Sequence, residues 1–133
     1  MIDHVSISVR DLDAAARFYD AVLGAIGYGR LRNRPATVGF GKRYPEFWLN
    51  HRHGMPAVAT DTGTHICVRA PDVDAVRRFH AAALAEGGTS DGEPGPRPQY
   101  SEGYYAAFIR DPEGNRIEAV TFTKRRASFR PSA

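Results

Sequence analysis

The 133-residue sequence predicts one α+β domain made of two tandem βαβββ modules. Three observations predict it. The chain repeats itself at an offset of 61 residues, each copy opens with an alternating strand, and a helical pattern follows that strand in both copies. A repeat of this length indicates two copies of one supersecondary unit, which usually pack around a pseudo-two-fold axis.

The repeat is visible without gaps. At the offset of 61, His4 falls on His65, Asp11 on Asp72 and Phe18 on Phe79, with nine identities over the 24 positions 4–27. Polar residues at the start of both copies can therefore converge at the centre of the molecule, and a histidine stands there in each.

Each copy opens with a strand that has one apolar and one polar face. Val5, Ile7 and Val9 alternate with His4, Ser6 and Ser8, and in the second copy Ile66, Val68 and Ala70 alternate with His65, Cys67 and Arg69. We expect the apolar faces to meet helices and the histidine faces to point the other way. Asp11 and Asp72 suit helix N-termini, apolar residues (Leu12, Ala15, Ala16, Tyr19, Leu23; Val73, Val76, Phe79, Ala83, Leu84) recur at helical spacing, and glycines (Gly24, Gly27, Gly87, Gly88) end both runs.

Shorter strands complete the modules. We predict strands in the first copy at Tyr28–Leu31, Thr37–Phe40 and Glu46–Asn50, and in the second at Tyr104–Arg110 and Asn115–Phe122. Asp111–Asn115 (DPEGN) predicts a tight hairpin, and residues 88–103, rich in Gly, Pro, Ser and Asp, predict a loop with at most a short strand. The expected domain covers residues 1–123, with modules at about 1–55 and 62–123 joined by a linker near 53–63.

Composition limits the classes of partner. The net charge is +3, but four cations in residues 124–133 (Lys124, Arg125, Arg126, Arg130) leave the body at −1, so we expect a basic mobile tail and no nucleic-acid face. Cys67 is the only cysteine, which excludes an internal disulfide and favours a reducing cytoplasm. We recognise neither a signal peptide nor a run long enough to span a membrane, and expect no membrane partner.

Three residues on the polar faces indicate chemistry: His4, His65 and Glu118. Glu118 alternates with Ile117 and Ala119 and so projects away from the helices. A single strand histidine is more often a packed or hydrogen-bonding residue than a ligand. Two imidazoles at equivalent positions with a carboxylate nevertheless suit a divalent ion such as Fe, Mn, Zn or Ni, with coordination positions left open for substrate.

The stretches DHVSISVRDLDAAARFYDAVLG, THICVRAPDVDAVRRFH and FIRDPEGNRIEAV resemble the vicinal oxygen chelate superfamily over about residues 2–123. That superfamily includes glyoxalase I, bleomycin-resistance proteins, fosfomycin-resistance enzymes and extradiol dioxygenases. The resemblance implies a curved eight-stranded mixed sheet, an incomplete barrel with helices outside, that encloses a metal. His4, His65 and Glu118 match three of the ligand positions, and Glu118 is also the candidate catalytic carboxylate.

The fourth ligand position departs from the resemblance. Aligning residues 47–49 with residues 117–119 places Trp48 opposite Glu118, where glyoxalase I carries a glutamate that is both ligand and base. An indole neither binds a metal nor takes a proton from carbon. The standard glyoxalase I reaction is therefore disfavoured unless Glu46 or Glu102 substitutes. Trp48 either stacks on a flat substrate or only fills the barrel.

Further substrate-binding candidates lie on the strands that face the expected cavity: Arg69, Tyr104, Phe108 and Arg110. An arginine there suits an anionic substrate, while surface aromatics and charges in such strands are often without function. Lesser candidates are Tyr105 on the same strand, the loop residues Tyr100, Ser101 and Glu102, and the pair His51 and His53 as a second metal site.

The residues and the resemblance together imply a cytoplasmic, divalent-metal-dependent lyase or isomerase, or else a dioxygenase, whose small substrate binds through two neighbouring oxygens. The metal would act as a Lewis acid toward a developing oxyanion. The alternatives are a metal-free, bleomycin-resistance-like binding protein and a scaffold without a ligand. Modules of this kind pair within a chain or between chains, and the resemblance implies a homodimer.

Overall fold

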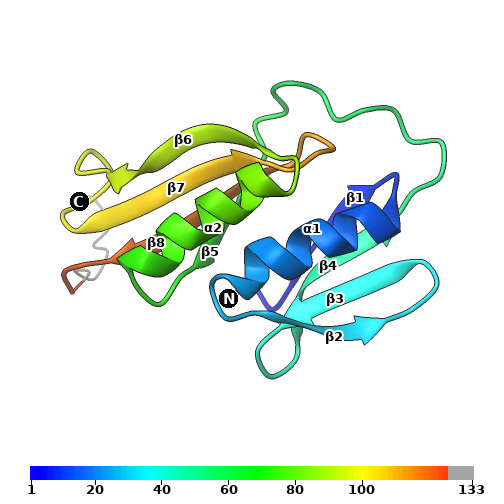
Figure 1. Cartoon of the computed structure of the whole chain (residues 1–133), viewed down its shortest axis with the longest axis horizontal. Coiled ribbons are helices and arrows are strands. Elements are labelled where there is room, and N and C mark those ends of the chain that lie inside the picture. Colours follow the sequence, from blue (N-terminus) through cyan, green and yellow to red (C-terminus); the bar gives the residue numbers. More distant parts are fainter. Residues whose placement is uncertain (126–133) are drawn as a thin grey trace.

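The structure is a computed structural model that describes residues 1–125. Its elements are β1 (Val5–Val9), α1 (Leu12–Gly24), β2 (Gly29–Asn33), β3 (Thr37–Gly41), β4 (Pro45–His51), β5 (Ile66–Arg69), α2 (Val73–Ala85), β6 (Thr89–Pro96), β7 (Tyr104–Arg110) and β8 (Arg116–Phe122). The order is βαβββ twice, as predicted (Figure 1).

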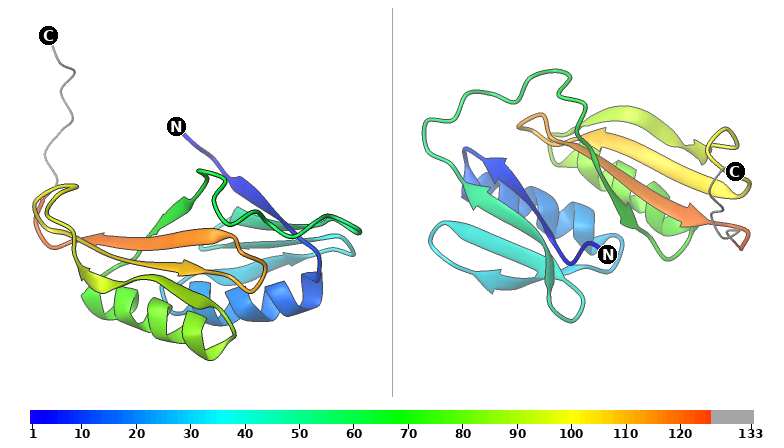
Figure 2. Two further views of the ribbon diagram at one scale, coloured as in Figure 1. Left: turned by 90° about the horizontal axis from the view of Figure 1, so that it is seen from above. Right: turned by 180° about the vertical axis from the view of Figure 1, so that it is seen from behind.

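The eight strands form two four-stranded mixed sheets, β1-β4-β3-β2 and β5-β8-β7-β6. The first and last strands of each module pair in parallel, and the remaining pairs are antiparallel. Both helices lie on one side of the sheets, and no helix within residues 1–125 covers the other side, called here the open face (Figure 2). The predicted α+β class is therefore confirmed, with the eight strands divided into two sheets rather than joined in one.

Aspartates cap both helices as their sequence positions predicted. The Asp11 side chain accepts a hydrogen bond from the Ala14 amide at 3.0 Å, and Asp72 accepts one from Ala75 at 2.8 Å. These contacts satisfy amides that have no partner inside the first turn of a helix. The apolar faces of β1 and β5 meet the helices, so the histidine-bearing faces are left on the open side.

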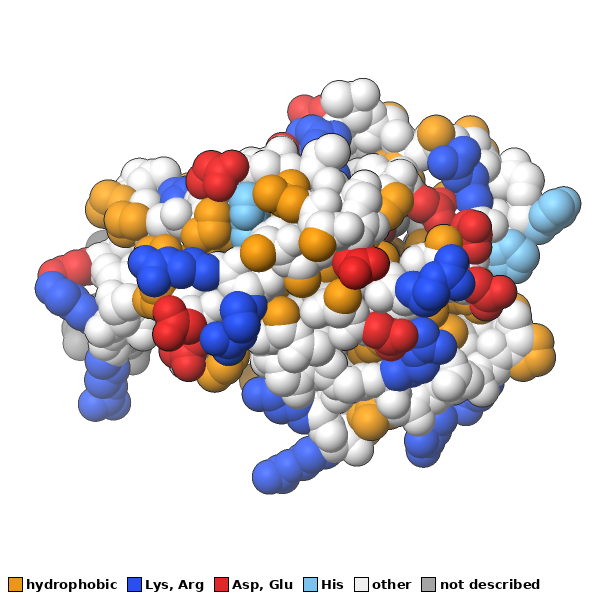
Figure 3. Space-filling model, viewed as in Figure 1, with side chains coloured by type: hydrophobic (Ala, Val, Ile, Leu, Met, Phe, Trp, Pro, Cys, Tyr) orange, Lys and Arg blue, Asp and Glu red, His pale blue; other side chains and the backbone are white. Residues whose placement is uncertain are grey.

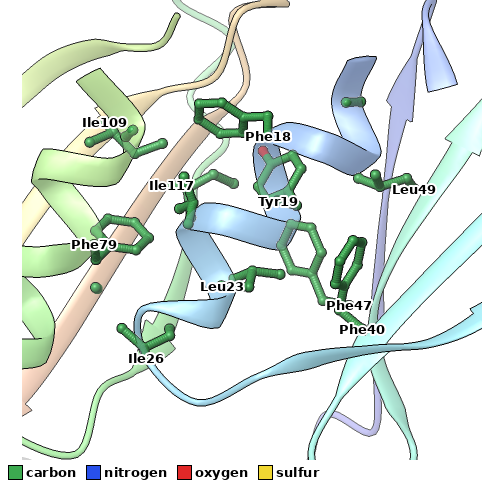
Figure 4. Packing of buried hydrophobic residues seen from close by; sticks show 14 of the residues in the cluster. Phe18, Tyr19, Leu23, Ile26, Phe40, Phe47, Leu49, Phe79, Ile109 and Ile117 are labelled. Atoms are coloured by element: carbon green, nitrogen blue, oxygen red, sulfur yellow. The ribbon is translucent and has the colours of Figure 1, made fainter. Parts of the chain in front are cut away.

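One hydrophobic core joins the two modules (Figure 4). Phe18, Tyr19 and Leu23 of α1 lie between the apolar faces of the two halves, and each is at most 2% exposed. Their neighbours are Phe40, Phe47 and Leu49 from the first sheet and Phe79, Ile109 and Ile117 from the second module. The modules therefore bury their helices against each other, since α1 and α2 are in direct contact.

A second link between the modules is polar. The predicted hairpin at Asp111–Asn115 forms, with Gly114 at φ 99°, and it reaches back to α1. The Tyr19 hydroxyl donates to Asp111 at 2.7 Å, and Glu113 accepts from the Arg10 amide at 2.6 Å. Because the Asp111 carboxylate is buried, desolvation raises its pKa above the ordinary value.

Two sequence expectations were wrong. Residues 89–96 form the eight-residue strand β6 rather than a loop with at most a short strand. Its glycines and prolines are accommodated because β6 is an edge strand with two register shifts. Leu84, placed in the apolar stripe of α2, is 46% exposed, whereas His80 is buried and bonds Ser90 at 2.8 Å.

Charges of both signs lie on the surface of the molecule. Acidic and basic side chains are interspersed on the helix side (Figure 3), so this face offers no large basic area. Among residues 1–125 no helix is both long and apolar enough to cross a membrane. Of the basic tail, Arg126 and Arg130 lie outside the described residues.

Candidate functional site

The strand register places Trp48 and Glu118 at equivalent positions of the two modules. Ser6 of β1 pairs with Trp48 of β4, and Cys67 of β5, 61 residues later, pairs with Glu118 of β8. Each histidine precedes the paired residue of its first strand by two positions and therefore shares its face. The hypothesis that tryptophan replaces the second carboxylate thus agrees with the paired backbone.

In the second module three predicted residues come together on the open face. The His65 Nε2 atom lies 3.0 Å from Glu118 Oε1, and the Tyr104 hydroxyl donates to Glu118 Oε2 at 2.5 Å. Glu118 is 2% exposed, whereas half of the His65 side chain is open to solvent. Both oxygens of a buried carboxylate therefore have a partner, and one of those partners, His65, faces solvent.

The surroundings suppress ionisation of the neighbouring weak acids. Burial first, and then the nearby charge of Glu118, raise the pKa of the Cys67 thiol to about 12. Burial and the hydrogen bond to Glu118 also raise the pKa of Tyr104 above the usual tyrosine value. Both groups are therefore neutral near pH 7 and act as hydrogen-bond donors beside the carboxylate.

A cavity of about 290 Å³ opens onto this cluster. Its lining includes Tyr100, Ser101 and Phe108 besides the three residues above. The Ser101 Oγ atom is buried without a hydrogen-bond partner. Because this oxygen has almost no exposed surface, the cavity does not present it to a ligand in this structure. Sequence reasoning gave Ser101 little weight, because nothing in the sequence shows that its hydroxyl is left unpaired.

His4 stands apart from the cluster. It shares with His65 the lining of a cavity of about 340 Å³ between β1 and β5, but its Nδ1 atom is bonded to Asp3 at 2.7 Å. Within residues 1–125 no three histidine, cysteine or acidic side chains are placed to hold one ion. One chain thus brings together two of the three predicted metal ligands.

The two residues that do meet fit a metal. The 3.0 Å separation of His65 Nε2 and Glu118 Oε1 is a hydrogen bond in this structure, and a divalent ion held by both atoms would replace it. An imidazole and a carboxylate are also donors that divalent transition ions accept. The Tyr104 hydrogen bond to the second oxygen leaves Glu118 with one oxygen for such an ion.

The remaining predicted residues lie around this centre. The Arg69 guanidinium stacks on the ring of Phe122, with its Cζ atom 4.8 Å from the centroid. Arg110 lies at the far end of β7 and is committed to the linker, since it donates to the Thr60 carbonyl at 2.7 Å. Glu102 pairs with Lys124, and Glu46 lies in the cavity that His4 lines.

Two lesser candidates also have ordinary neighbours. The rings of His51 and His53 have centroids 6.3 Å apart and belong to no group of three possible ligands among residues 1–125. Tyr105 lies on the helix side of β7, where its hydroxyl accepts from Arg77 at 3.2 Å.

Comparison with known sequences decides the family. Residues 1–119 match the family model of the glyoxalase/bleomycin resistance protein/dioxygenase superfamily. The chain belongs to this superfamily. Its two βαβββ modules are thus those of a glyoxalase-like protein.

Individual relatives set the level of similarity. A lactoylglutathione lyase of Arabidopsis thaliana is 30% identical over 126 residues, which cover 88% of this chain and 42% of that protein. This member of the superfamily therefore spans less than half the length of the curated relatives it matches. The shared identity supports a glyoxalase-like fold and leaves the particular reaction open.

Solved structures agree. A glyoxalase/bleomycin resistance protein from Albidiferax ferrireducens T118 has a TM-score of 0.77 and 34% identity, with 89% of this chain and 96% of that chain covered. Glyoxalase I from Zea mays has a TM-score of 0.69 at 22% identity, with 89% and 44% covered, and so shows the fold alone.

Proposed function

We propose that the protein is a divalent-metal-dependent enzyme of the glyoxalase-like type. It would act as a lyase, isomerase or dioxygenase on a small substrate that binds through two neighbouring oxygens. The observation that carries the proposal is the 3.0 Å approach of His65 Nε2 to the buried Glu118 Oε1, with Tyr104 holding the other oxygen. Family membership supports it, because the superfamily contains such enzymes.

His65 and Glu118 would hold the ion, which supplies Lewis-acid stabilisation of a developing oxyanion when bound. Glu118 is the only carboxylate of the cluster, because its counterpart in the first module is Trp48. Glu118 would therefore also accept and release the proton that is transferred during the reaction. Tyr104, Phe108 and Arg69 would contact the substrate, since they lie on the same open face of the second module.

We further propose a homodimer in which the partner subunit's His4 is the third ligand. Two features support this arrangement. In the described part of one chain His4 does not join His65 and Glu118, and no helix of that part covers the open face of either sheet (Figure 2). Each half of a metal site would then lie on a surface that a second copy can cover.

Metal content tests the proposal. Protein refolded in turn with Fe, Mn, Zn and Ni and then desalted should retain close to one ion per chain for at least one metal. His65→Ala should abolish this retention, and His53→Ala is the matched control because its ring lies outside the cluster. Metal-free wild-type protein, or equal retention by both variants, would overturn the assignment.

Mixed variants test the shared site. His4→Ala and His65→Ala chains should each fail to bind metal alone. When unfolded together and refolded, heterodimers regain one intact site if His4 and His65 act across subunits, because one of the two sites then carries neither substitution. If all ligands came from one chain, mixing would restore nothing.

A second function is favoured by a specific observation. Trp48 occupies the carboxylate position of the first module, and no three-ligand group forms within the described part of one chain. A metal-free binding protein of the bleomycin-resistance type needs neither a carboxylate at that position nor a group of three metal ligands. Unaltered ligand binding after exhaustive chelation, together with no metal retention, would favour this function over the enzyme.

A further inference from the structure

The indole of Trp48 packs closely against a glycine. Gly39 of β3 is the register partner of Trp48, and a Cβ atom added to Gly39 would lie 2.9 Å from Trp48 Cζ3 and 3.0 Å from Cε3. Any other residue at position 39 would therefore push the ring away. The ring leans toward β3, on the opposite side of β4 from β1 and His4.

An arginine stacks on this ring. The Arg34 Cζ atom lies 5.6 Å from the indole centroid, and the side chain is exposed. Among residues 1–125 its guanidinium forms neither a hydrogen bond nor an ion pair. Glu46 is an acid on the same face of β4, two residues before Trp48. It lies toward the end of β4 that is farther from Arg34. The planar donor fork of Arg34 is thus available to an anion.

The second module offers an internal comparison. Phe108 lies on Gly92, where an added Cβ would be 2.9 Å from its Cδ1, and the Arg97 Cζ atom is 5.5 Å from the Phe108 centroid. Arg97, however, donates to the carbonyl of Glu93 at 2.6 Å and to that of Pro96 at 3.3 Å. That arginine is held by its own strand, whereas Arg34 is not.

Polar residues occupy the same face of the sheet as Trp48. Ser6, Thr37 and Asn50 share its face by strand register, and within the described residues their side chains form no hydrogen bonds. The patch therefore combines one flat apolar surface, one uncommitted planar cation and several free hydroxyl or amide groups. A ligand with a flat body and a negative end matches this combination.

We propose that Trp48 and Arg34 bind a planar carboxylate, an aromatic or conjugated acid whose carboxylate pairs with Arg34 and whose plane packs against the indole. The inference names the substrate class of the site proposed above and rests on that function in assigning both patches to one substrate. Glu118 supplies a carboxylate side chain in the second module. The region around the equivalent Trp48 would then bind the carboxylate of a ligand in the first module.

The test uses the only tryptophan of the chain as its probe. Indole fluorescence of chelator-treated full-length protein is titrated with benzoate, with neutral benzamide and with acetate. Benzoate should change the signal saturably and bind about tenfold or more tightly than the other two, because it alone offers both the plane and the charge. Arg34→Gln should remove the preference for benzoate over benzamide. Arg32→Gln, an exposed arginine of β2 without a ring contact, should retain it.

The outcomes separate this inference from the metal site. Equal binding of benzoate and benzamide, equal losses in the two arginine variants, or no saturable signal would overturn it. Because metal is absent throughout, a protein that fails the metal tests but passes this one keeps the acid-binding patch and loses the proposed chemistry. A protein that passes the metal tests but fails this one keeps the proposed metal site, and the acid-binding patch is then excluded.

Discussion

At the scale of single residues, the decisive side chain is Glu118. Its side chain is almost fully buried. The free-energy cost of burying it is reduced because both oxygens have partners, His65 Nε2 and the Tyr104 hydroxyl. The rings of Tyr100 and Phe122 pack against Tyr104 edge to face, with centroids 5.2 and 5.4 Å away, and so fix its hydroxyl. Tyr104 thereby determines which oxygen of Glu118 would be free for the proposed metal.

Replacing Tyr104 by Phe should test that role. The variant keeps the ring packing but leaves Glu118 Oε2 without its donor, so the carboxylate can rotate and metal affinity should fall about tenfold. Isothermal titration with the metal that wild-type protein retains measures the change. Tyr44→Phe, at an exposed tyrosine, is the control. Equal affinity of the two variants would show that Tyr104 does not position the carboxylate.

At the scale of elements, the N-terminal caps hold the two helices at their predicted starts. The Asp11 side chain accepts a hydrogen bond from the Ala14 amide. The backbone amide of Asp11 in turn donates to the Glu113 carboxylate of the second module. The start of α1 therefore contributes both to helix stability and to the contact between modules. The edge strand β6 shows the opposite case, in which composition predicted a loop and pairing with β7 produced a strand.

Asp11→Ala should lower the free energy of unfolding by about 1 kcal/mol, because one amide of the first turn loses its acceptor. Asp13→Ala, also an acid of the first turn, removes charge but no cap and should cost less. Urea denaturation of both variants gives the comparison. A larger loss for Asp13→Ala would contradict the role given to Asp11.

At the scale of the whole molecule, one core and one polar link unite the modules. The polar link depends on Asp111, which accepts from Tyr19 and from Asn115 while buried. Desolvation raises its pKa, so the folded protein keeps the Asp111 proton to a higher pH than the unfolded chain does. Ionisation of Asp111 therefore costs stability as the pH rises through its folded pKa.

Asp111→Asn cannot ionise and should lack this cost. Relative to the variant, wild-type protein should lose unfolding free energy as the pH rises from about 4, the usual carboxyl value, and the difference should level off above the folded pKa. Urea midpoints measured for both proteins between about pH 4 and pH 7 test the sign. Parallel profiles, or a difference that grows toward low pH in favour of the variant, would exclude the linkage.

The sequence alone determined the duplicated βαβββ order, the faces of the strands and the equivalence of Trp48 with Glu118, because these features depend on local periodicity and on a repeat of fixed offset. Only the tertiary structure decided which side chains meet. It joined His65 to Glu118 and Tyr104, kept His4 beside Asp3, and brought Gly39 and Arg34 to the ring of Trp48. Such contacts depend on strand pairing and rotamers over separations of up to 53 residues along the chain, which no local pattern encodes.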